Sequence, residues 1–100
     1  MTTTRLVALD PTAVLDHIET TPRPFGQQSD LITRSRPDTL RIVTRPERHQ
    51  AEMVGAVLYA DGDALTVVLV RGGASVGIAT LSGAIDPARA LDTIAWLLPR

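Results

Sequence analysis

The stretch "EMVGAVLYADGDALTVVLVRGGASVGIATL" (residues 52–81) decides the fold of this 100-residue chain. Its apolar runs are separated by two pairs of turn residues, Asp61-Gly62 and Gly72-Gly73. Tight hairpins require positive φ at the turn, a conformation that glycine adopts without steric strain. The stretch therefore predicts a three-stranded antiparallel meander over residues 52–81.

The first two strands of this meander are apolar on both faces. In the first, Val57 and Tyr59 alternate with Val54 and Leu58, so neither face is polar. The second, "ALTVVLVR" (64–71), shows the same two-sided pattern. A strand of this kind is typically buried on both faces, so both faces of the predicted sheet require a covering layer.

Two similar phrases, "ALDPTAVLDHI" (8–18) and "AIDPARALDTI" (84–94), predict the starts of two helices. In each phrase the aspartate suits the N-cap. The proline after it suits the first helical position, where a backbone N–H is not needed. We therefore expect helices over about residues 10–20 and 86–98.

The remaining segments complete an α+β domain spanning residues 1–100. Strands are predicted over residues 5–9, over residues 31–34 as a weak edge strand, and over residues 39–45. The expected fold is an antiparallel sheet of four to six strands with two helices packed on it.

Two helices of about three turns each can cover roughly one face of such a sheet. If both helices lie on one face, the other face needs a partner, and large exposed apolar faces usually mark interfaces. A second copy of the chain is the simplest partner, because closed homodimers are the commonest assembly. The alternatives are helices on opposite faces, or a sheet that curls and buries itself.

The last helix gives a second indication of a partner. Leu91, Ile94, Ala95 and Leu98 share one face at helical spacing, and Trp96 lies off this stripe. Tryptophan is enriched among binding hot spots, so Trp96 is a candidate interface anchor. The alternative is that its ring folds over the helix end onto the domain's own surface.

Phe25 lies in the predicted loop "TTPRPFGQQSD" (20–30). There it either pins the loop to the core or serves as a recognition residue. The residues expected at a protein interface are Trp96, Leu97, Arg89, Tyr59 and Phe25.

The segment 34–48 concentrates positive charge in a chain whose net charge is −1. Its five arginines against Asp38 and Glu47 give a net charge of +3. The arginines are Arg34, Arg36, Arg41, Arg45 and Arg48. Such a segment suits a solvated edge strand, an acidic protein surface or a nucleic-acid backbone. No aromatic side chain interleaves the arginines to stack on bases, so nucleic acid is the less favoured partner.

Composition excludes several kinds of chemistry. The chain has no cysteine, which excludes disulfides, cysteine-based metal sites and thiol catalysis. Its two histidines do not form a metal-ligand pattern, and no catalytic constellation is present, so we expect no metal, no cofactor and no catalytic residue.

All ten basic residues are arginine, which is typical of a GC-rich coding genome such as that of an actinobacterium or one of its phages. No signal peptide or membrane-spanning run is predicted, and we expect a cytoplasmic protein.

The sequence thus predicts a non-enzymatic protein–protein interaction module, such as an adaptor, a regulator or a chaperone-like protein. We expect it to be a homodimer formed through an apolar sheet face, the C-terminal helix or both. The alternative is a nucleic-acid-associated protein that uses the arginines of segment 34–48. A third option is an enzyme or small-ligand binder in which loop 20–30 acts as a lid.

Overall fold

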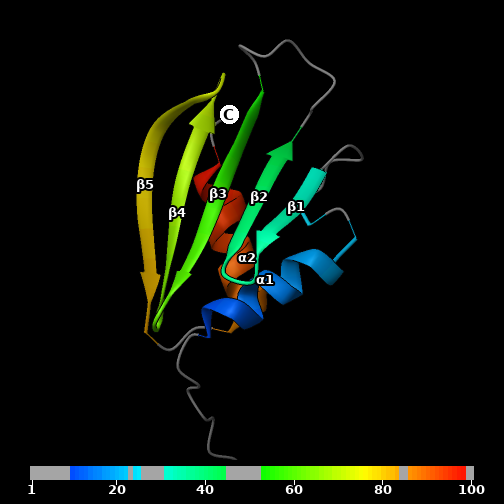
Figure 1. Cartoon of the computed structure of the whole chain (residues 1–100), viewed down its shortest axis with the longest axis vertical. Helices are drawn as coiled ribbons and strands as arrows, with labels where there is room; N and C mark the ends of the chain where they lie inside the picture. Colours follow the sequence, from blue (N-terminus) through cyan, green and yellow to red (C-terminus); the bar gives the residue numbers. More distant parts are fainter. Residues whose placement is uncertain (1–9, 23, 26–30, 45–52, 84–85, 99–100) are drawn as a thin grey trace, which may run out of the picture.

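The chain forms a five-stranded antiparallel sheet and two helices, as seen in a computed structural model (Figure 1). The structure describes residues 10–22, 24–25, 31–44, 53–83 and 86–98. The elements are α1 (Pro11–Thr20), β1 (Leu31–Arg36), β2 (Thr39–Thr44), β3 (Val54–Asp61), β4 (Ala64–Arg71), β5 (Ala74–Ser82) and α2 (Pro87–Leu97). The strands lie in the order β1-β2-β3-β4-β5, each antiparallel to the next. The predicted α+β fold is confirmed, including the weak edge strand, while the strand expected at residues 5–9 lies outside the described residues.

The two predicted hairpins join β3 to β4 and β4 to β5. The β4–β5 turn is Gly72-Gly73, as predicted. The β3–β4 turn lies one residue later than predicted and consists of Gly62 and Asp63, because Asp61 still pairs within β3. The turn glycines have φ between 59° and 82°, the left-handed region that glycine tolerates.

Aspartate caps both helices, as the repeated phrases predict. The Asp10 carboxylate accepts hydrogen bonds from the backbone N–H groups of Thr12 and Ala13 at 3.1 and 3.4 Å. The Asp86 carboxylate accepts one from the N–H of Arg89 at 2.8 Å. A hydrogen bond from the Thr12 hydroxyl is the main reason why the pKa of Asp10 lies below its ordinary value of 3.8. The two copies of the phrase therefore share helix-start chemistry.

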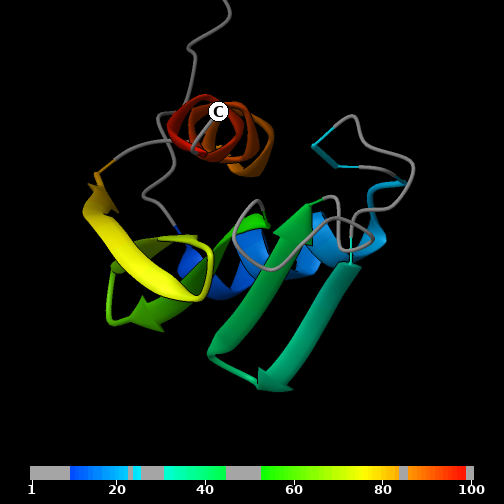
Figure 2. The same cartoon turned by 90° about the horizontal axis from the view of Figure 1, so that it is seen from above.

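Both helices lie on the same side of the sheet (Figures 1 and 2). Helix α1 contacts β3 and α2. The two-sided pattern of β3 and β4 is confirmed, since one alternation faces the helices and the other faces away. The side chains buried between sheet and helices include Val14, Leu15, Ile18, Leu40, Ile42, Ala56, Leu58, Leu65, Val67, Ala90, Leu91 and Ile94. The core is aliphatic.

One helical position differs from the prediction. Ala95 is exposed, whereas Ala90 is fully buried beside Leu91 and Ile94. The buried stripe of α2 is therefore rotated toward Ala90. Because alanine is compatible with either environment, its identity did not reveal which side of the stripe would face the sheet.

Candidate interaction surface

None of the described elements covers the face of the sheet that lies opposite the helices. We call it the open face; it points toward the viewer in Figure 1. One row of directly opposed residues crosses it through all five strands. From β1 to β5 the row is Thr33, Arg41, Val57, Val68 and Ile78. Along this row the face is polar on β1 and β2 and apolar on β3 to β5, although Leu31 and Val43 place apolar side chains on the first two strands as well.

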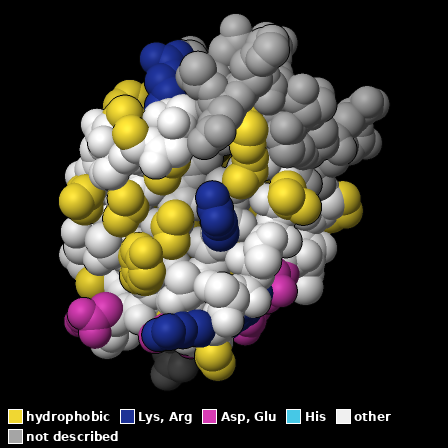
Figure 3. All heavy atoms as spheres, turned by 45° about the horizontal axis from the view of Figure 1, so that its top comes forward, with side chains coloured by type: hydrophobic (Ala, Val, Ile, Leu, Met, Phe, Trp, Pro, Cys, Tyr) yellow, Lys and Arg dark blue, Asp and Glu magenta, His cyan; other side chains and the backbone are white. Residues whose placement is uncertain are grey.

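The apolar half of the open face consists of Val57, Val68, Val70 and Ile78. Ile78 is 69 % exposed, and the three valines are half-buried. Tyr59 adds a ring that is 43 % exposed next to Thr66 of β4. Figure 3 shows hydrophobic side chains in several patches on the surface, with basic side chains among them. Apolar area of this kind costs free energy while it faces water.

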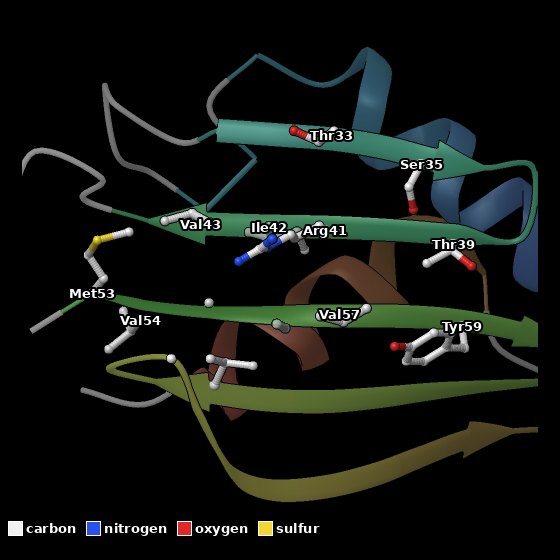
Figure 4. A pocket seen from close by; sticks show the side chains of 14 residues that line it. Thr33, Ser35, Thr39, Arg41, Ile42, Val43, Met53, Val54, Val57 and Tyr59 are labelled. Atoms are coloured by element: carbon white, nitrogen blue, oxygen red, sulfur yellow. The ribbon is translucent and has the colours of Figure 1, made fainter. Parts of the chain in front are cut away.

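A hollow of about 750 Å³ lies on the open face over β1 to β4. Its lining includes hydroxyl side chains from β1 and β2, namely Thr33, Ser35 and Thr39. Arg41 lies over β2 and β3, with Met53 toward one end of the hollow and Tyr59 toward the other (Figure 4). No described residue of loop 20–30, the predicted lid, lines this hollow.

Gly55 lies within this hollow, opposite Val43 of β2 and Val70 of β4. A Cβ atom on Gly55 would lie 2.1 Å from the carbonyl oxygen of Ile42, far inside van der Waals contact. Strands β2 and β3 therefore approach each other so closely that only glycine fits. The missing side chain also leaves the face recessed between Val43 and Val70.

Arg41 contributes a positive charge to the open face. Its side chain is exposed, and within the described part of the chain it makes no ion pair or side-chain hydrogen bond. A partner that covers this part of the face has to leave water around Arg41 or present a hydrogen-bond acceptor to it, because burying an unpaired charge costs free energy.

Arg34, by contrast, is part of the domain's own structure. It lies on the helix-facing side of β1, where its Nη1 is 2.6 Å from both Asp16 Oδ1 and Glu19 Oε1 of α1. Its Nη2 donates to the carbonyl oxygen of Pro37. The hydrogen bonds to Asp16, and then to Glu19, raise the pKa of the guanidinium, which stays charged throughout. The Arg34 side chain therefore ties β1 to α1.

We expect Arg34→Ala to lower the free energy of unfolding by about 1 kcal/mol, with a smaller loss at high salt. Both carboxylates are substantially exposed, so water can replace much of what the guanidinium supplies. Arg36→Ala is the matched control, because Arg36 is exposed at the end of the same strand and should change stability by less than about 0.5 kcal/mol. Urea unfolding at low and high salt measures both variants. Equal effects from both would contradict the role given to Arg34.

The five arginines of segment 34–48 do not form one described surface. Arg34 is held against α1, Arg36 lies at the end of β1, and Arg41 lies on the open face. Arg45 and Arg48 lie outside the described residues. An anionic partner for this segment stays a prediction.

Four of the five predicted interface residues lie on two separate surfaces. Trp96 is 73 % exposed on α2, so its ring does not fold onto the domain. Arg89 is exposed on the same helix, 3.9 Å from the carboxylate of Asp86, and Leu97 is half-buried. Tyr59 belongs to the open face, on the other side of the sheet from α2 (Figure 4).

Phe25 packs against the hydrophobic core. This contact agrees with the interpretation in which it pins the loop, and it makes Phe25 a weaker candidate for a recognition residue.

Ile78 has the largest exposed fraction among the described large aliphatic side chains, but it is not among the interface residues predicted from the sequence. The segment "ASVGIATL" (74–81) places apolar residues on both alternations, so its sequence does not show which side faces outward. The predicted turn at Gly72-Gly73 alone would have paired Ile78 with Val67, on the side of the sheet that faces the helices. A bulge at Val76 shifts the register by one residue, so Ile78 lies opposite Val68 on the open face, and no sequence signal indicated that bulge.

Within the described residues, no three histidine, aspartate or glutamate side chains come together as metal ligands would. No helix in the described ranges combines the length and the apolar character needed to cross a bilayer.

Comparisons with protein-family models, with curated proteins and with solved structures find no match for this chain.

Proposed function

We propose that the chain is a non-enzymatic protein–protein interaction module that forms a homodimer through the uncovered side of its sheet. The observation that carries the proposal is the apolar half of the open face, which ends in Ile78 on β5. Both helices pack on the other face, so the chain has no described element left to cover this one. An adaptor, a regulator or a chaperone-like protein would use such an assembly.

Burial of this surface offers a sizeable free energy. Fully burying a valine or isoleucine side chain contributes about 1.5–3 kcal/mol, and a two-fold dimer buries each residue twice. Loss of translational and rotational freedom costs an estimated 4–15 kcal/mol on association. Only the exposed parts of Ile78 and the half-buried valines are newly buried, so together they contribute a free energy of the same order as this cost.

A dimer of this kind leaves the outer surface of α2 available. Trp96 and Arg89 are exposed there, on the helix side of the molecule. Because tryptophan and arginine are the residue types most enriched at hot spots, this second surface suits a different protein partner. The module would then join itself on one side and a partner on the other.

We expect Ile78→Glu to raise the dissociation constant of the homodimer by about 100-fold or more, because each copy would bury an unpaired carboxylate at the contact. The side chain is mostly exposed in a single chain, so the fold should survive, as circular dichroism can verify. The matched variant Trp96→Ala should change the dissociation constant by less than about threefold. Sedimentation velocity measures both constants.

The reverse result would contradict the proposal. If Trp96→Ala separates the dimer and Ile78→Glu does not, the C-terminal helix forms the interface instead of the sheet.

A further inference from the structure

The row of opposed residues that crosses the open face carries a charge near one end and the most exposed apolar side chain at the other. Arg41 lies on β2 and Ile78 on β5, three strand spacings apart. A partner has to place apolar atoms over Ile78, which is 69 % exposed, because its contact with water costs free energy. The same partner has to leave Arg41 hydrated or paired. These two requirements restrict how a second copy can lie on the face.

Two stacked sheets keep their strands nearly aligned, about 10 Å apart. A two-fold axis between the stacked faces therefore runs either across the strands or along them. An axis across the strands sets each strand over its own copy, so an axis through the row places Arg41 over the partner's Arg41. Opposed like charges disfavour this arrangement. A shift along the strands separates the two arginines, but it sets Ile78 over a hydroxyl side chain on either side of the row, Ser75 or Thr80.

An axis along the strands sets different strands over each other, and its position decides which ones. Placed on β3, it sets Arg41 over the partner's Val68, where the charge is buried without an acceptor. Placed on β5, it leaves Val57 uncovered, because the partner's sheet then begins at β5. Placed on β4, it sets Val57 over the partner's Ile78, and Val68 over its own copy. Arg41 then lies beyond the edge of the partner's sheet, in water.

We propose that two copies stack their open faces about a two-fold axis along β4, so that β3, β4 and β5 of one copy lie over β5, β4 and β3 of the other. This inference rests on the proposed homodimer and specifies which strands meet. The neighbouring rows of the face agree with this axis. Val70 lies over its own copy, and the phenol of Tyr59 lies over the partner's Thr80, whose hydroxyl can accept a hydrogen bond from it.

This arrangement leaves β1 and β2 outside the contact. The hollow over these two strands stays open, with Arg41 at the rim of the interface, where charged residues are normally found (Figure 4). Leu31 and Val43 also stay uncovered, because an axis that covers Val43 brings Arg41 under the partner as well.

A distance between two spin labels tests the axis, and the chain has no cysteine of its own to interfere. Thr33→Cys carries the label at an exposed position on β1. An axis along β4 separates the two copies of β1 by six strand spacings, so with the sheet separation the labels lie about 30 Å apart. Pulsed electron paramagnetic resonance measures this distance, and circular dichroism verifies the fold. Ser35→Cys, exposed on the same strand, should give nearly the same distance, because rotation about this axis does not change a position along the strands.

The outcomes separate this inference from the proposed function. A distance near 30 Å that disappears in the Ile78→Glu background supports the axis along β4. A distance of about 20 Å or less corresponds to an axis along β3 or across the strands, which overturns the inference but retains a homodimer through the open face. A distance above about 40 Å corresponds to a contact outside the open face and overturns both, as does a chain that stays monomeric in sedimentation.

Discussion

Replacing Gly55 with alanine is expected to lower the free energy of unfolding by at least about 3 kcal/mol, a large share of the stability of a domain of this size. The added Cβ would lie 2.1 Å from the carbonyl oxygen of Ile42. That oxygen belongs to the backbone of β2, so no side-chain rotation can relieve the overlap. The strand pair has to separate locally, and separation weakens the hydrogen-bond ladder between β2 and β3.

Gly77→Ala provides the control for this prediction. A Cβ on Gly77 would meet only Cδ1 of the Leu69 side chain at 3.4 Å, an ordinary contact with a flexible group. We expect a change of less than about 1 kcal/mol, because removing glycine from a strand also reduces the entropy of the unfolded chain. Urea unfolding of both variants gives the comparison. Similar stabilities would contradict the close approach of β2 and β3.

Leu58→Ala is the second substitution with a large expected effect, a loss of about 3 kcal/mol in the free energy of unfolding. Leu58 is fully buried in the middle of β3, between Leu40 of β2 and Val67 of β4, and faces the helices. Truncation removes apolar contacts and leaves a cavity that the rigid neighbouring strands cannot close.

The matched control for Leu58→Ala is Ile78→Ala, which removes a similar side chain from the open face. Ile78 is mostly exposed in the single chain, so the loss should be below about 0.5 kcal/mol. The measurement has to be made at a protein concentration too low for dimers, since association adds to apparent stability. A loss of several kcal/mol from Ile78→Ala in the monomer would mean that the chain itself buries the open face.

Local sequence signals predicted most of the elements. The Asp-Pro phrases specify helix starts because capping depends only on neighbouring residues, and both caps are present. The turn pairs Asp61-Gly62 and Gly72-Gly73 placed both hairpins, with an error of one residue at the first, whose turn is Gly62-Asp63. The alternation of β3 and β4 was correct on both faces because strand periodicity is fixed by the backbone.

Long-range arrangement could not be predicted in the same way. That both helices share one side of the sheet depends on how α1 and α2 pack together, which no local pattern states. The role of Arg34 could not be predicted for the same reason. Its partners, Asp16 and Glu19, are 18 and 15 residues away in the chain, so its charge alone indicated an anionic partner outside the domain.

Sedimentation equilibrium of the unmodified chain, from low to high micromolar concentration, tests the central claim most directly. The uncovered side of the sheet, from Val57 to the exposed Ile78, requires a second copy to bury it. We predict a reversible approach to twice the mass of one chain, lost in Ile78→Glu. A mass of one chain at every concentration would contradict the account.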